Sequence, residues 1–172
     1  MAKTQNNPKA KELWTFIKFS IAGIAATLVE MVVHLILDSY ILKSMNVEPF
    51  QMWKIAGQYV FDFSGGGAGK GTMIAFVIST IVGYAIAYIV NRKVTFNANN
   101  NLLKSTILYT IMVVFIVCFQ SWGGPMCKQL LLSAGMTNDF LLGLVPKTIM
   151  CIICTLFSYP LNRFVIQKNS DK

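Results

Sequence analysis

Four long apolar segments constrain this chain of 172 residues more than any other feature of its sequence. A helix needs about 20 apolar residues to cross a hydrocarbon core of about 30 Å. Segments of this kind lie at residues 16–41, 72–90, 105–122 and 140–161. Because lipid offers the backbone no hydrogen-bond partners, each segment is expected to be a helix. The sequence therefore predicts an all-α integral membrane protein with four transmembrane helices in a single domain, residues 1–172.

The composition agrees with a chain embedded in lipid. Hydrophobic residues make up 55% of the sequence and charged residues 13%, about half the ~25% usual in soluble domains. A soluble fold of this composition would expose large apolar patches to water. The formal net charge of +8 matters here through the positions of the basic residues around the spans. No nucleic-acid partner is expected.

Basic residues predict the orientation of the spans. Four crossings put both termini on one side of the membrane. Ten Lys and Arg residues lie on the side of the termini and four on the other, so the positive-inside rule places both termini in the cytoplasm. The ten are Lys3, Lys9, Lys11, Lys18, Arg92, Lys93, Lys104, Arg163, Lys168 and Lys172, and the four are Lys43, Lys54, Lys70 and Lys128.

The longest connection is the outer loop at residues 42–71. Residues 47–63 mix aromatic and aliphatic side chains with polar ones, a pattern that favours an amphipathic helix at the membrane interface. The Gly-rich residues 64–71 are expected to be a flexible connection, and residues 97–101 a short cytoplasmic turn. Cys127 is expected in the loop between the third and fourth spans.

Two stretches of the sequence resemble each other. The second span closes with AYIVNRKV at 87–94, and the fourth closes with SYPLNRFV at 158–165. Both follow the pattern small-Tyr-x-x-Asn-Arg-x-Val at a cytoplasmic helix end, which predicts two parallel two-helix repeats. The alternative is coincidence, because polar and basic residues are common where cations favour the helix dipole.

Further motifs occur in order along the chain. They are FIKFSIAG at 16–23, ATLVE at 26–30, NRKVTF at 91–96, and Lys147 followed by LNRFV at 161–165. Over residues 13–167 the chain thereby resembles the GtrA-like membrane proteins, which often have Asn-Thr-Leu-Val-Asp at the second motif. It departs from them at Glu30, where Asp is commoner, at Gln167, which replaces a closing aromatic residue, and in its longer outer loop.

The resemblance implies a flippase in the bacterial cytoplasmic membrane. Its substrate would be a monosaccharide linked to a polyprenyl phosphate such as undecaprenyl phosphate, used in cell-surface polysaccharide glycosylation. The alternative is a non-transporting accessory subunit that binds and stabilises a membrane glycosyltransferase. A third option is a small four-helix cation exporter of the drug-resistance type, which also uses a Glu in its first helix but lacks the double Asn-Arg ending.

Ionisable residues within the spans are the first candidates for substrate binding, since each costs about 2.5–3.5 kcal/mol on insertion scales. Glu30, His34 and Asp38 recur every four residues and share one face of the first helix. Glu30 is expected to be functional, whereas Asp38 is expected to be interfacial, and His34 is open to a local structural role. Lys147 is expected to pair with Glu30 or Asp38, in a structural or a transport role, or to meet a lipid phosphate.

The Asn-Arg endings supply the remaining candidates. Arg92, Lys93 and Arg163 are suited to bind the phosphate of the substrate, although the positive-inside rule alone also explains basic residues there. Asn91 and Asn162 would cap helix ends or bond the sugar phosphate. No catalytic, cofactor or metal site is predicted, so the chain is not expected to be an enzyme. Its expected partners are the lipid-linked sugar and membrane lipid, with a glycosyltransferase or a second copy of the chain as further options.

Overall fold

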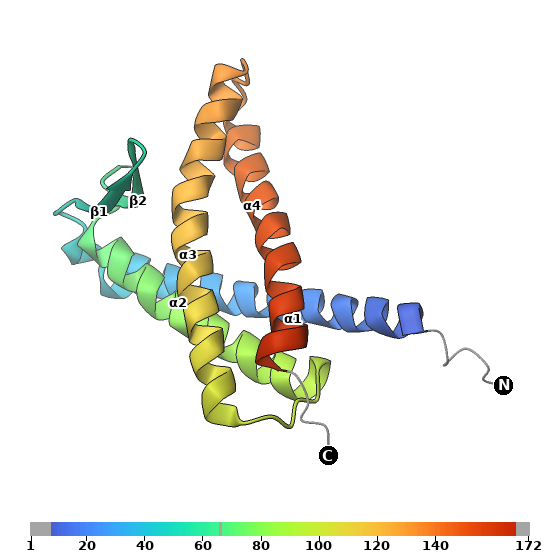
Figure 1. Cartoon of the computed structure of the whole chain (residues 1–172). Coiled ribbons are helices and arrows are strands. Elements are labelled where there is room, and N and C mark those ends of the chain that lie inside the picture. Colours follow the sequence, from blue (N-terminus) through green and yellow to red (C-terminus); the bar gives the residue numbers. More distant parts are fainter. Residues whose placement is uncertain (1–7, 66, 168–172) are drawn as a thin grey trace.

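The computed structural model describes residues 8–65 and 67–167, and helices make up most of it (Figure 1). The long helices are α1 (Pro8–Ile36), α2 (Lys70–Val90), α3 (Leu102–Ser133) and α4 (Asp139–Leu161). Four helical segments are long and apolar enough to cross a membrane: Ala10–Ile41, Lys70–Thr95, Leu102–Ser133 and Val145–Ile166. The predicted four-helix, multi-pass membrane protein is confirmed at this level.

Three of the long helices end in a five-residue π turn. These turns are η1 (Leu37–Ile41) after α1, η3 (Asn91–Thr95) after α2 and η4 (Asn162–Ile166) after α4. The predicted spans 72–90 and 140–161 end where α2 and α4 end. The two Asn-Arg motifs therefore do not lie in loops: they form the π turns that close these helices.

Helix α3 is longer than the sequence indicated. Its predicted end at residue 122 is wrong, because the helix continues to Ser133 through Gly123, Gly124 and Pro125. Cys127, expected in a loop, therefore lies within α3. A proline inside a helix removes one backbone hydrogen bond, but the apolar residues that follow continue the helix here. With a rise of about 1.5 Å per residue, these 32 residues span about 48 Å, more than the ~30 Å hydrocarbon core.

The connection between α1 and α2 contains a β-hairpin, so the interfacial helix predicted over residues 47–63 is wrong. Strands β1 (Phe50–Ile55) and β2 (Gln58–Phe63) pair antiparallel, with Phe50 opposite Phe63. Ala56 and Gly57 join them with φ of 50° and 84°, the two positive values that a type I′ hairpin turn requires. Aromatic and β-branched residues fit a pleated strand well, and this preference prevails over the helical spacing. A short 3-10 turn, η2 (Lys43–Met45), precedes the hairpin.

The hairpin packs against both α2 and α3. The rings of Phe61 and Phe63 lie 6.3 and 5.7 Å from that of Phe76 on α2. On α3, the Trp122 indole N–H donates to the Ile55 carbonyl at 3.2 Å, and the Gln129 amide donates to Gln58 at 3.0 Å. The hairpin therefore connects the first pair of helices to the second.

The long helices form two pairs that cross. Helix α1 packs along α2, and α3 packs along α4, so the bundle consists of two helical hairpins (Figure 1). Helix α1 also contacts α4, and η3 and η4 pack against α1 and α3 respectively. The buried cores are small and many large apolar side chains are exposed, as suits helices that face lipid.

Candidate membrane-embedded polar site

A stripe of small residues brings α2 close to α1. Gly71, Ala75, Ser79, Gly83 and Ala87 recur every fourth residue of α2, and all are buried. Small residues at this spacing let helix backbones approach closely in a membrane. The spacing is visible in the sequence and is a signal of close helix packing. At two of its positions the neighbours are known: Gly83 lies against Glu30 of α1, and Gly71 lies against Leu42 and Asn46 beyond η1.

Glu30 lies against this stripe. Its Oε1 accepts a hydrogen bond of 3.0 Å from the hydroxyl of Thr80 on α2. A Cβ atom at Gly83 would lie 2.9 Å from both Cβ and Oε2 of Glu30, so the absence of a side chain at Gly83 is what admits the carboxyl group. Glu30 is partly buried. The α1–α2 interface therefore holds a carboxyl group within a membrane-spanning segment, bonded to a neutral hydroxyl.

Asp38 closes the end of the same interface that lies next to the hairpin connection. Its Oδ1 accepts from the Thr72 hydroxyl at 2.7 Å and from the Asn46 amide at 3.1 Å. The Asn46 side chain in turn accepts from the Thr72 backbone N–H at 2.7 Å, near the start of α2. These bonds join the end of α1 to the beginning of α2. His34 lies between Glu30 and Asp38 on α1 and is partly buried.

Lys147 does not join Glu30, His34 and Asp38, the polar strip along α1 and η1. It lies exposed on α4 near the start of the span Val145–Ile166. The ion pairs within residues 8–65 and 67–167 are Lys70–Glu48 and Arg163–Glu12, so the expected pairing of Lys147 with Glu30 or Asp38 is not formed. The reason is the packing: Glu30 faces α2, whereas α1 meets α4 near Phe16 and Phe19, whose rings lie 5.0 and 5.4 Å from that of Tyr159.

Asn91 and Asn162 are buried inside the helix ends, with 3% and 1% of their surfaces exposed. Their carbonyl groups accept from the backbone N–H of Phe96 and Gln167, five residues on, each at 2.9 Å. The Asn91 side chain accepts from Thr95 at 2.9 Å, and that of Asn162 accepts from Gln167 at 3.3 Å. Of the two roles predicted for these residues, the geometry supports closing the helix ends.

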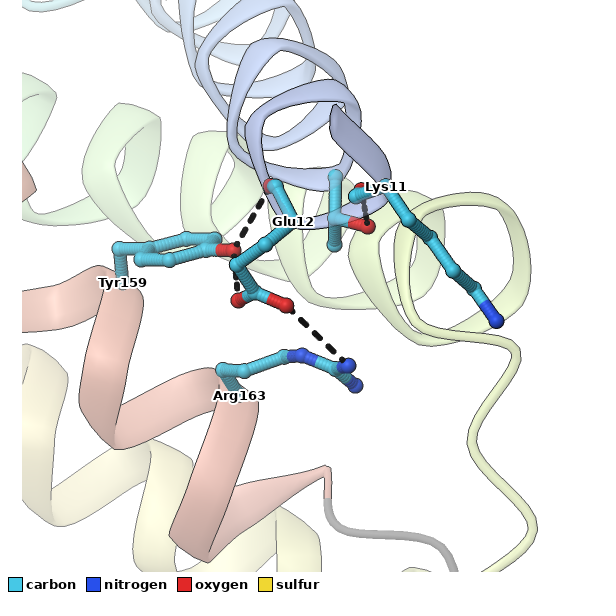
Figure 2. Close-up of polar contacts among 5 residues, drawn as sticks. Lys11, Glu12, Tyr159 and Arg163 are labelled. Carbon is cyan, nitrogen blue, oxygen red and sulfur yellow. Dashed lines mark hydrogen bonds and ion pairs between the residues drawn. The ribbon is translucent and has the colours of Figure 1, made fainter. Parts of the chain in front are cut away.

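The two arginines of the motifs have different partners. Arg92 donates to both oxygens of Asn100, at 2.8 and 2.6 Å, and the Asn100 amide donates to the Ile166 carbonyl at 2.6 Å. Arg163 donates through Nη2 to the Glu12 carboxylate at 3.4 Å (Figure 2). These bonds gather both arginines at the end of the bundle where α1 begins. Lys93, next to Arg92, is exposed.

The tyrosines of the two motifs make corresponding contacts. Tyr88 on α2 donates to the Ser105 hydroxyl at 3.0 Å, and its ring lies 4.8 Å from that of Tyr109 on α3. Tyr159 on α4 donates to the Glu12 carboxylate at 2.5 Å, and its ring lies 5.0 Å from that of Phe16 on α1. In each case one tyrosine contacts two residues four positions apart, at the beginning of the first helix of the other pair.

The fold and these contacts define a four-helix membrane protein with a polar strip between α1 and α2. No family model matches the chain, and no curated protein or solved structure is significantly similar to it. The resemblance to the GtrA-like proteins therefore rests on the sequence motifs alone.

Proposed function

We propose that this chain is a flippase that moves a polyprenyl-phosphate-linked monosaccharide across the bacterial cytoplasmic membrane, for cell-surface polysaccharide glycosylation. The observation that carries the proposal is Glu30, which lies within a span and bonds Thr80 rather than a basic side chain. A carboxyl group in lipid is costly and is usually functional. With His34 and Asp38 it forms a polar strip that extends to the outer end of α1.

The proposed architecture has two parallel two-helix repeats, with both termini in the cytoplasm. Two observations support it: both Asn-Arg motifs form π turns, and Tyr88 and Tyr159 make corresponding contacts. The excess of basic residues on the side of the termini supports the orientation. In this mechanism the α1–α2 pair rocks against the α3–α4 pair, and α1 must also part from α2 to expose the polar strip, because Glu30 bonds Thr80 within that pair. Membership in the GtrA-like family is part of the same proposal.

Transport in liposomes tests this function. The purified protein is reconstituted in vesicles that contain a short-chain polyprenyl-phosphate hexose, and transbilayer movement of the lipid is followed. The proposal predicts faster movement than in empty vesicles, with little acceleration of an ordinary phospholipid in the same vesicles. Movement at the rate of empty vesicles for several hexoses would contradict it.

An accessory role for a membrane glycosyltransferase is the second candidate. It is favoured by the state of the candidate phosphate ligands: Asn91 and Asn162 are buried, and Arg92 is occupied by Asn100. An accessory subunit needs no open polar path. It predicts that a purified glycosyltransferase loses stability or activity when this chain is removed, and that variants of Glu30 leave that support intact.

A further inference from the structure

Where the beginning of α1 contacts the end of α4, two hydrogen-bond donors meet one carboxylate. Tyr159 and Arg163, one turn apart on α4 and η4, both point at Glu12 (Figure 2). One oxygen of the Glu12 carboxylate accepts from the Tyr159 hydroxyl at 2.5 Å, and the other accepts from Nη2 of Arg163 at 3.4 Å. The side chain of Lys11 extends away from the cluster (Figure 2).

One donor in this cluster is left over. The Nε–H of Arg163 is buried and has no hydrogen-bond partner within the described part of the chain. A guanidinium group presents paired N–H donors that suit two oxygens of one oxyanion, as in bidentate phosphate contacts. Glu12 uses this group at a single, long contact. A buried donor without a partner is costly, so Glu12 satisfies the cluster incompletely.

In the corresponding cluster of the other helix pair, no buried side-chain donor among the described residues lacks a hydrogen-bond partner. Arg92 reaches two oxygens of Asn100, at 2.8 and 2.6 Å, and both belong to neutral groups of the neighbouring connection. Tyr88 donates to a serine hydroxyl instead of a carboxylate. The Arg163 end is therefore the one where a negatively charged group already occupies a set of phosphate-type donors.

From this difference we infer that Glu12 is an internal occupant of a phosphate site formed by Arg163 and Tyr159. A phosphate ester on a lipid takes its place, with two oxygens on the guanidinium edge and one of them also on the Tyr159 hydroxyl. The inference rests on the proposed function, for which it identifies the phosphate ligand. Carboxylate and phosphate exchange rather than bind together, because two anions would repel each other at this site.

The position of the site fits a lipid headgroup. Glu12 lies near the start of the span Ala10–Ile41, and Arg163 lies near the end of the span Val145–Ile166. The Glu12 side chain retains 42% of its exposure and that of Arg163 retains 32%, so the cluster is open to solvent or headgroups. Release of the Glu12 carboxylate would leave the 3.4 Å hydrogen bond from the Tyr159 hydroxyl to the Glu12 backbone carbonyl as the polar link at this contact. Binding would thereby loosen the two helix pairs.

Native mass spectrometry of the full chain in a non-ionic detergent tests the inference. The probes are farnesyl phosphate, farnesol as the uncharged analogue, and a dioleoyl phosphatidic acid. Wild type is expected to bind farnesyl phosphate in preference to farnesol. Glu12→Gln should raise the affinity for farnesyl phosphate by about threefold or more, because it removes a competing charge. Such a gain cannot result from unfolding.

The loss variant is Arg163→Lys, which keeps the charge but not the bidentate edge, and it should lower the affinity by about tenfold. Lys104→Gln and Glu48→Gln, which change exposed charges elsewhere, serve as controls and should bind as wild type does. If Glu12→Gln binds no more tightly than wild type, or Arg163→Lys binds as well, the inference is overturned.

Two further comparisons complete the experiment. Tighter binding of farnesyl phosphate than of phosphatidic acid identifies a prenyl phosphate as the ligand, whereas equal binding identifies any lipid phosphate; both outcomes keep the phosphate site. Binding with the predicted variant pattern but without transport in liposomes would refute the flippase and leave the site in place. Transport without the predicted variant pattern would refute the phosphate site and leave the flippase in place.

Discussion

Gly83 shows how one residue without a side chain makes room for a charged one. Its missing Cβ is the space that Glu30 occupies, since an added methyl group would lie 2.9 Å from the Glu30 Cβ, well inside the ~3.5–4.0 Å of favourable carbon contacts. The backbone conformation at Gly83 is helical, so the constraint is one of space.

Replacement of Gly83 by Ala should therefore destabilise the protein. We expect a loss of about 1–3 kcal/mol from overpacking between α1 and α2, measured as thermal unfolding in detergent. Gly124→Ala on α3 is the matched control, because nothing lies within 4 Å of the added Cβ, and it should be neutral or stabilising by up to about 1 kcal/mol. Equal shifts for the two variants would show that the contact at Glu30 does not constrain the site.

At the same scale, sequence reasoning identified Glu30 but not its partner. A charge in a span is visible in the sequence, whereas the contact to Thr80 depends on how α2 packs against α1. Lys147 was the wrong partner because its pairing depends on how α1 and α4 pack, which no local pattern specifies. Glu12 was missed because an acidic residue at the beginning of a helix is ordinary in sequence, and its importance depends on Tyr159 and Arg163.

At the scale of elements, the π turns after α2 and α4 depend on their buried asparagines. Asn162→Ala removes the acceptor of Gln167, which is only 1% exposed, and should cost about 1–3 kcal/mol. Asn91→Ala is the matched variant: it frees the hydroxyl of Thr95, which is partly exposed and can bond water, so its cost should be smaller. Unfolding of both variants in one detergent gives the comparison, and a larger loss for Asn91→Ala would contradict the assignment.

The hairpin should respond to acid through Asp62. The Ser64 hydroxyl, followed by the Gln51 amide and the Ser64 backbone N–H, holds the pKa of Asp62 below its ordinary value. The ionised form therefore stabilises the hairpin above the unfolded pKa of about 4, and this stabilisation is lost as pH falls through the lower folded pKa. Trp122 fluorescence, in a background with Trp14 and Trp53 replaced by Phe, should report loosening below about pH 4.

Asp62→Asn is the control for this acid response. The Asn side chain does not titrate, so the Asp62-dependent part of the response should disappear. Glu48, whose pKa the hydrogen bond from Lys70 lowers, contributes separately and should be replaced by Gln in both proteins. An unchanged acid transition in the Asn variant would exclude Asp62 as its source.

Element boundaries were predictable where composition changes sharply. The ends of α2 and α4 followed from the switch to polar residues at Asn91 and Asn162. The extension of α3 to Ser133 did not, because Gly123–Gly124–Pro125 is typical of a break, yet the helix continues through it into the apolar residues that follow. The hairpin was missed because the spacing of its aromatic residues fits an amphipathic helix and two short strands equally well. The turn at Ala56-Gly57, with positive φ at both residues, distinguishes the strands from a helix.

At the scale of the whole molecule, the proposed orientation is open to a direct test. Val47 lies beyond the outer end of α1, Leu103 lies near the start of α3, and both are strongly exposed. Each is changed to Cys in a background with the four native cysteines replaced by Ala. A membrane-impermeant maleimide added to intact cells should label the Val47→Cys protein and spare the Leu103→Cys protein. The opposite result would reverse the orientation.

The two helix pairs are joined at both ends of the bundle: the hairpin bonds α3 at Trp122 and Gln129, and Glu12 bonds Tyr159 and Arg163 on the other side. A rocking transporter must loosen these contacts alternately. The polar strip of Glu30, His34 and Asp38 lies within the α1–α2 pair, so its exposure also requires α1 to part from α2.

The most direct measurement compares Glu30→Gln with Glu48→Gln in the liposome assay for a polyprenyl-phosphate hexose. Each variant removes one carboxylate; Glu30 lies within a span and Glu48 on the outer connection, paired with Lys70. We predict that Glu30→Gln slows movement of the lipid by at least about tenfold, equivalent to about 1.4 kcal/mol, while Glu48→Gln matches wild type. Full activity of a folded Glu30→Gln protein would contradict the central role of the polar strip.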